Sequence, residues 1–276
     1  MKKVLVVTGA LFLLAVALAA CAAAPAAVPT VEPTAVPTAK PTAAPATQAP
    51  AATPQLVADS IRGGKLYDNW MKELGVDVPE GDQPLWATQS SNTRTGGDTW
   101  RCKECHGWDY KGLDGAYGSG SHRTGFKGIL GASKLSAEEL SAWLDGTKNP
   151  DHDFSTYFTA DDINQMVSFT QHGSVDMSTF ITADKTIVGG DIAHGKTLFD
   201  GTCKACHGDD GKTLNFGDDA SPEYLGTIAA DNPWEFFHKT SVGQPGTPNM
   251  PAALGLGWAQ QDIIDVLTYV QTLPTQ

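Results

Sequence analysis

A cysteine-rich motif with the pattern Cys-x-x-Cys-His occurs twice, ending once at His106 and once at His207. Two thiols one helical turn apart can bond to the two vinyl groups on one edge of a porphyrin. The imidazole that follows can then bind the iron from one face. A zinc site would need a second pair of ligands close by, and a redox dithiol gives no reason for a histidine after both pairs. The spacing therefore predicts two covalently bound haems c, with thioether bonds at Cys102, Cys105, Cys203 and Cys206 and iron ligands at His106 and His207.

The residues around both motifs resemble class I c-type cytochromes, over residues 57–171 and 190–274. In that family a glycine and an aromatic residue on the N-terminal helix contact an aromatic residue on the C-terminal helix. The matching positions in the first copy are Gly63, Tyr67 and Phe169. In the second copy they are Gly195, Phe199 and Tyr269. The resemblance implies an all-α fold and a role in electron transfer.

The family's second iron ligand is usually a methionine on a proline-rich loop shortly before the last helix. Met250, followed by Pro251 and 43 residues after His207, fits that position in the second copy. In the first copy the matching position holds His152, 46 residues after His106. The resemblance therefore implies histidine and methionine ligands for the second haem, and we expect two histidine ligands for the first.

Other ligands remain open for the first haem. His122 lies in a glycine- and serine-rich loop, and Met166 and Met177 are further candidates. Met166 aligns with Val266 inside the last helix, which favours a core position. An iron with an open sixth position is the last alternative.

The chain is organised as two copies of one unit, each reading helix, motif, long loop, helix. Asp162-Ile163 recurs as Asp262-Ile263, offset by 100 residues. The first copy carries an insertion of 31 residues, at about 69–100, between its first helix and its motif. We expect two tandem cytochrome c-like domains of short helices and long loops, at 55–180 and 185–276, after a disordered linker.

Capping signals predict where several helices begin. Ser136 to Glu139 and Thr159 to Asp162 have the pattern of capping boxes. Asp191 is a predicted N-cap, and Asn232 precedes a proline at the first position of another helix. No run of residues has the pattern of paired strands.

The N-terminal part has the features of an export signal. Two lysines precede an apolar run that ends in Leu18-Ala19-Ala20-Cys21. This resembles the lipobox of bacterial lipoproteins, which implies a signal peptide at 1–20 and a lipid on Cys21. Residues 21–54 are rich in Ala, Pro and Thr, with a proline at every fourth position from Pro25 to Pro45. We expect an extended linker that holds the globular part away from the membrane.

The charge balance excludes some functions. The chain has 19 Lys and Arg against 31 Asp and Glu, so its net charge is −12. A nucleic-acid-binding protein needs a basic face, so nucleic acid is not an expected partner. The five cysteines are fully assigned, one to lipid and four to haem.

These observations predict a dihaem electron carrier rather than an enzyme, lipid-anchored outside the cytoplasm in the periplasm or on the cell surface. Its partners would be other redox proteins. One alternative is a haem-dependent oxidoreductase of a small sulfur or nitrogen compound, for which the insertion could shape a pocket. The other is a cytochrome subunit of a larger respiratory complex.

Overall fold

The computed structural model describes residues 53–276. In it, polar side chains cap several helices at the predicted positions. Ser136 and Glu139 form one capping box, and Thr159 and Asp162 form another. Each helix begins at the residue after its cap, which satisfies backbone N–H groups that otherwise lack partners. The helices opened by Ser136, Thr159, Asp191 and Asn232 are α3 (Ala137–Leu144), α4 (Ala160–Ser168), α5 (Ile192–Thr202) and α8 (Pro233–Val242).

The first half is built around the long helix α1 (Pro54–Leu74), which begins after the N-cap Thr53 and ends at Gly75 in the left-handed conformation. The backbone of Asn69 is not helical, so α1 is kinked there, at the start of the expected insertion. The first motif forms the short helix α2 (Cys102–His106). Helix α4 runs on into a single π-helical turn, Phe169–Gly173.

The second half has the same order of helix, motif and final helix. After α5, the second motif forms α6 (Lys204–His207). Then follow α7 (Leu225–Asp231), α8 and the final helix α9 (Gln260–Val270). Among residues 53–276 there are isolated β-bridges but no β-strand, which agrees with the expected all-α fold.

The same helix crossing occurs in both halves. A Cβ atom on Gly63 of α1 would lie 2.0 Å from the Gln165 carbonyl oxygen of α4. A Cβ atom on Gly195 of α5 would lie 1.9 Å from the Asp265 carbonyl oxygen of α9. Only glycine allows such a close approach of two backbones. The two carbonyl residues are 100 positions apart, which is the offset of the sequence repeat.

The expected aromatic contacts accompany both crossings. The ring centres of Tyr67 and Phe169 are 5.4 Å apart, and those of Phe199 and Tyr269 are 5.3 Å apart. All four rings are buried, so each pair anchors the first helix of its half to the last.

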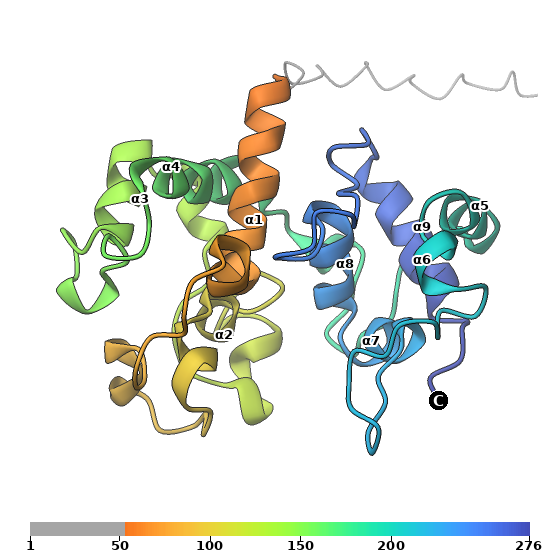
Figure 1. The fold of residues 1–276 in the computed structure, drawn as a ribbon, viewed down its shortest axis with the longest axis horizontal. Coiled ribbons are helices and arrows are strands. Elements are labelled where there is room, and N and C mark those ends of the chain that lie inside the picture. Colours follow the sequence, from red (N-terminus) through yellow and green to blue (C-terminus); the bar gives the residue numbers. More distant parts are fainter. Residues whose placement is uncertain (1–52) are drawn as a thin grey trace, which may run out of the picture. The chain divides into compact units, whose positions relative to one another are not determined.

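The two halves contact each other through α1 and α8 (Figure 1). His238 on α8 is fully buried. Its Nε2 atom lies 3.1 Å from the Gly64 carbonyl oxygen, and its Nδ1 atom lies 2.7 Å from the Tyr110 hydroxyl. Both partners belong to the first half. A neutral imidazole satisfies both bonds, because Nε2 donates and Nδ1 accepts.

A buried ion cluster lies in the same interface. Asp68 of α1 has no exposed surface and lies 2.7 Å from the Arg101 guanidinium and 2.5 Å from the Lys239 ammonium. Burial raises the pKa of Asp68, but the charges of Lys239 and Arg101 outweigh it and keep the pKa below its ordinary value. The buried hydrophobic residues form one cluster that includes residues of both halves.

The insertion contains the end of α1 and two 3-10 turns, Pro84–Thr88 and Gly96–Trp100, joined by loops. Trp70 of α1 donates a hydrogen bond to the Trp100 carbonyl oxygen at 2.8 Å, which ties the end of the insertion to the helix where it starts. The loops contain further 3-10 turns, at Ala116–Gly118, Gly120–His122, Leu130–Lys134, Pro150–His152 and Met177–Thr179.

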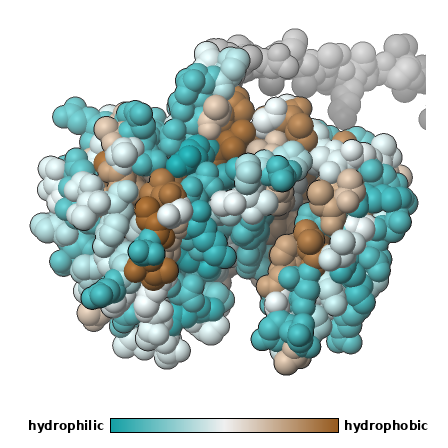
Figure 2. Space-filling view, in the orientation of Figure 1, coloured by the Kyte–Doolittle hydropathy of each residue, from teal (hydrophilic) through white to brown (hydrophobic). Residues whose placement is uncertain are grey.

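The visible surface of the globular part is largely hydrophilic, with small separate hydrophobic patches (Figure 2). Among residues 53–276, no helix is long and apolar enough to cross a membrane. The expected signal peptide at 1–20, the lipidation residue Cys21 and nearly all of the linker lie outside the described residues.

Candidate functional site

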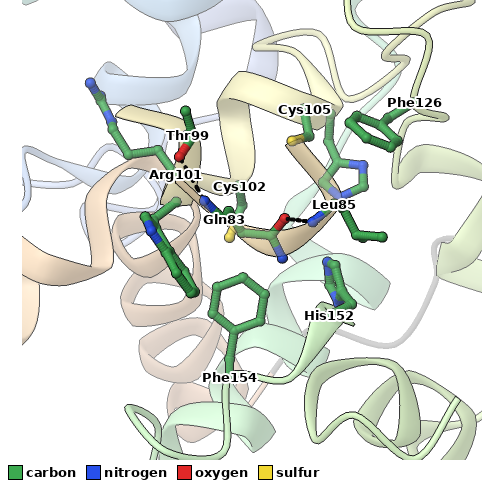
Figure 3. Close-up of a pocket in the computed structure, with 11 residues that line it drawn as sticks. Gln83, Leu85, Thr99, Arg101, Cys102, Cys105, Phe126, His152 and Phe154 are labelled. Carbon is green, nitrogen blue, oxygen red and sulfur yellow. Dashed lines mark hydrogen bonds between the residues drawn. The ribbon is translucent and has the colours of Figure 1, made fainter. Parts of the chain in front are cut away.

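The first motif opens onto a cavity of about 620 Å³. Cys102 and His106 line it from α2, Tyr67 from α1, and His152 from the loop after α3. A smaller recess adjoins these residues and adds Cys105 to the lining. Figure 3 shows Cys102 and Cys105 on the motif helix with His152 across the recess from them. The structure therefore brings together the two predicted thioether residues and the two predicted histidine ligands.

The two histidines of this cavity face each other at a defined distance. The ring centres of His106 and His152 are 6.2 Å apart, with an angle of 73° between the ring planes. A metal bound at about 2 Å to one nitrogen of each ring would place the ring centres about 6 Å apart. The observed spacing thus leaves room for one metal ion between the rings.

Hydrogen bonds orient both rings. His106 Nδ1 donates to the Lys127 carbonyl oxygen at 2.6 Å, and His152 Nδ1 donates to the Trp143 carbonyl oxygen at 2.8 Å. Since a carbonyl oxygen can only accept, each Nδ1 carries the proton and each Nε2 keeps a free lone pair. A backbone acceptor on the far nitrogen is the usual support of a metal-binding histidine.

The protonation states also fit metal binding. Burial, with a smaller contribution from the nearby His152, lowers the pKa of His106 to about 4. Burial likewise lowers the pKa of His152. Both imidazoles are therefore neutral at pH 7, which is the form that binds a metal.

The thiols of the first motif are not poised for zinc or disulfide chemistry. Burial raises the pKa of both Cys102 and Cys105 to about 12. Zinc binding and dithiol exchange both use thiolates, which are stabilised by nearby positive charge rather than by burial among apolar groups. The site favours the haem interpretation of the motif over these two alternatives.

His122 lies elsewhere. Its Nδ1 atom is 3.2 Å from Glu104 Oε1, its Nε2 atom is 3.3 Å from an Arg94 guanidinium nitrogen, and its ring stacks on Tyr117. It does not line the cavity that contains His106 and His152. Met166 lines that cavity from α4 but is a buried core residue, and Met177 is fully buried in the core cluster.

The second motif opens onto a separate cavity of about 280 Å³. Cys203, Cys206 and His207 line it from one side, and Met250 lies on the loop between α8 and α9. Phe236 and Thr240 of α8 form part of its wall. The structure thus places all four predicted site residues of the second half around one cavity.

One detail distinguishes the second cavity from the first. The Nδ1 atom of His207 is buried and has no hydrogen-bond partner within the described part of the chain. Burial lowers the pKa of His207, so this imidazole is neutral too. Buried polar atoms without a hydrogen-bond partner are uncommon in folded proteins. The Nδ1 atom of His106, by contrast, is bonded to the Lys127 carbonyl oxygen.

The insertion supplies residues that sequence reasoning did not single out. Gln83 and Leu85 line the recess beside Cys102 and His152, and Leu85 also lines the large cavity. The length of the insertion pointed to a pocket wall, but no residue type in it marked these two positions.

The cytochrome c family model matches residues 192–274. This match supports a cytochrome c domain in the second half. Such a domain implies haem c, a haem-based role in electron transfer and, typically, a place outside the cytoplasm. The match begins after the first half and does not include the first motif. No curated protein and no solved structure matches the chain.

Proposed function

We propose that this protein transfers electrons through two covalently bound haems c with different axial ligands, while a lipid on Cys21 holds it at a membrane outside the cytoplasm. His106 and His152 would ligate the first iron, and His207 and Met250 the second. The two halves would be tandem cytochrome c domains, an assignment supported by the repeated glycine crossing and by the repeated aromatic contact.

The observation that carries the proposal is the pair of facing imidazoles in the first cavity. Their 6.2 Å spacing, their free Nε2 atoms and the adjacent thiols of Cys102 and Cys105 together fit one haem with a histidine on each face. The cytochrome c domain of the second half contains the same motif, so the chemistry assigned there extends naturally to the first half.

The bound haem supplies reversible one-electron chemistry at its iron. Cys102, Cys105, Cys203 and Cys206 would hold it covalently, and backbone carbonyl groups orient the imidazoles of His106 and His152. If His152 and Met250 also bind the irons, neither iron would keep a free position for a substrate. This supports a carrier rather than an oxidoreductase of a small sulfur or nitrogen compound.

The ligand difference gives a direction to electron flow. A thioether ligand raises the reduction potential of a haem relative to an imidazole. The first site should then have the lower potential, and electrons should pass from the first half to the second. The acidic chain favours a redox partner with a basic docking face.

A spectroscopic redox titration of the purified protein tests this proposal. We expect two haems per chain by mass spectrometry and two midpoint potentials. The low-potential component should have a low-spin bis-histidine signal in electron paramagnetic resonance. One haem per chain, or two equal midpoints, contradicts the proposal. Rapid stoichiometric binding of carbon monoxide to one reduced haem would instead favour the oxidoreductase.

A further inference from the structure

The insertion of the first half contacts the distal loop of each half. By distal loop we mean the segment that carries the second iron ligand, residues 145–154 for His152 and 243–251 for Met250. Two polar side chains of the insertion make these contacts, Gln83 to the first loop and Glu73 to the second. We propose that the insertion braces both distal loops and that Gln83 and Glu73 are the positioning residues. This inference rests on the proposed ligation by His152 and Met250.

Gln83 is held firmly enough to act as a brace. It is buried, its backbone N–H donates to Thr99 Oγ1 at 2.9 Å, and its side-chain oxygen accepts from the Leu85 backbone at 2.7 Å. Thr99 is itself buried and bonded to the Gly96 carbonyl oxygen. Figure 3 shows Gln83 bonded to both Thr99 and Leu85 at the edge of the recess.

The remaining hydrogen-bonding group of Gln83 reaches the first distal loop. Its Nε2 donates to the Asp151 carbonyl oxygen at 2.6 Å, and Asp151 immediately precedes His152. Within residues 53–276, this is the only hydrogen bond between the insertion and residues 145–154. The loop has no long helix of its own, since His152 ends a single 3-10 turn, Pro150–His152. Its other bonds come mainly from the end of α3, such as Phe154 N–H to the Leu144 carbonyl oxygen.

Glu73 makes the corresponding contact on the other half. It lies beyond the kink at Asn69, in the last turn of α1, and its Oε2 accepts from the Gly246 backbone N–H at 2.8 Å. Gly246 has a positive φ of 67° and lies four residues before Met250. Arg62 holds the other carboxylate oxygen of Glu73 at 3.1 Å. The Met250 loop is therefore tied to α1 of the opposite half.

The consequence for the two irons follows from these contacts. A distal ligand dissociates when its loop moves away, and an exogenous ligand can bind only then. Removing a bond that restrains the loop increases the population of its open state. Loss of the Gln83 bond should loosen only the His152 loop, and loss of the Glu73 bond should loosen only the Met250 loop.

The test uses the full haem-loaded protein and three variants. Gln83→Glu keeps the size and the acceptor but removes the donor to Asp151, and Glu73→Ala removes the acceptor for Gly246. Gln89→Ala is the matched control, because Gln89 also lies in the insertion but its side chain bonds only to the backbone of Ser91 and Asn92. Hydrogen exchange by mass spectrometry is read on both distal loops, and cyanide binding is followed at each oxidised haem.

We expect several-fold faster exchange in residues 145–154, and several-fold faster cyanide binding at the first haem, in Gln83→Glu alone. The same changes should occur in residues 243–251 and at the second haem in Glu73→Ala alone. The proposal that the insertion braces the loops would be contradicted by unchanged exchange in residues 145–154 of Gln83→Glu or in residues 243–251 of Glu73→Ala. Faster exchange in both loops of either variant would also contradict it. Gln83→Ala serves as a second variant if Gln83→Glu folds poorly.

Failure of the brace and failure of the proposed function give different results. Hydrogen exchange reads the loops directly and does not depend on which residues ligate the irons. A wild-type first haem without a bis-histidine spectrum would remove the ligand assignment even if both loops loosened as expected.

Discussion

His152 is the residue on which the assignment of the first haem depends. Its ring faces His106 across the cavity with its Nε2 atom free, whereas His122 is engaged by Glu104 and Arg94. The loop position alone identified His152 in the sequence, because Met250 occupies the matching place in the other copy. That position favoured His152 but left His122 open, since only the folded chain shows which histidine lies beside His106.

We expect His152→Ala to remove the low-spin bis-histidine signal of the first haem, because the variant lacks the nitrogen that would bind the iron from the distal face. Electron paramagnetic resonance of the oxidised protein measures this change. His122→Ala is the control and should leave the signal intact. An intact signal in His152→Ala would mean that another residue is the ligand.

Met250→His should lower the midpoint potential of the second haem, because imidazole is a stronger donor than a thioether and favours the oxidised iron. A redox titration should show the higher midpoint moving towards the lower one, while the first haem is unaffected. If both midpoints stayed in place, Met250 would not be a ligand.

At the scale of elements, the repeated helix crossing is the feature that the sequence predicted best. The glycine and aromatic positions recur in both copies, so each supports the interpretation of the other. Gly63 and Gly195 indeed lie where two helix backbones meet. The kink at Asn69 and the path of the insertion could not be predicted, because no second copy of that segment exists for comparison.

Gly63→Ala and Gly195→Ala should each lower the free energy of unfolding by about 1–3 kcal/mol, because the added methyl group would collide with a backbone carbonyl oxygen. Chemical denaturation measures the change. Gly201→Ala in α5 is the control, since its Cβ would meet nothing within 4 Å. That variant should gain about 0.5–1 kcal/mol from its better helix propensity. Equal losses in all three variants would contradict the crossing.

At the scale of the whole molecule, the halves are joined by polar groups whose pairing no sequence pattern predicts. Asp68, Arg101 and Lys239 are far apart along the chain, and each is an ordinary charged residue in its own segment. The repeat predicts two tandem domains but says nothing about how they contact each other. The structure shows buried hydrogen bonds and ion pairs between the halves, because α8 packs on α1.

His238 should make stability depend on pH. Burial lowers its pKa to about 4, and the opposing effect of the Asp68 carboxylate does not reverse this. In the unfolded chain the pKa of a histidine is about 6.5, so between these values the unfolded state binds the proton and the folded state does not. Stability is therefore lost as the pH falls from about 6.5 to about 4, by at most about 3 kcal/mol.

Denaturation curves at several pH values test this effect. His238→Gln, which can still donate to Gly64 and accept from Tyr110, should fold and show a flatter dependence between these pH values. His172→Gln removes an exposed histidine and should keep the wild-type slope. A slope that survives in His238→Gln would assign the effect to another group.

The side chain of His238 belongs to the second half but takes both of its hydrogen bonds from the first. A substitution at Tyr110 therefore removes a hydrogen bond from the second half. A substitution at His238 removes two hydrogen bonds from the first half. The two copies of the unit have lost their modularity. Neither could be exchanged for a domain from another protein, or expressed alone, without exposing a surface that only its twin can cover.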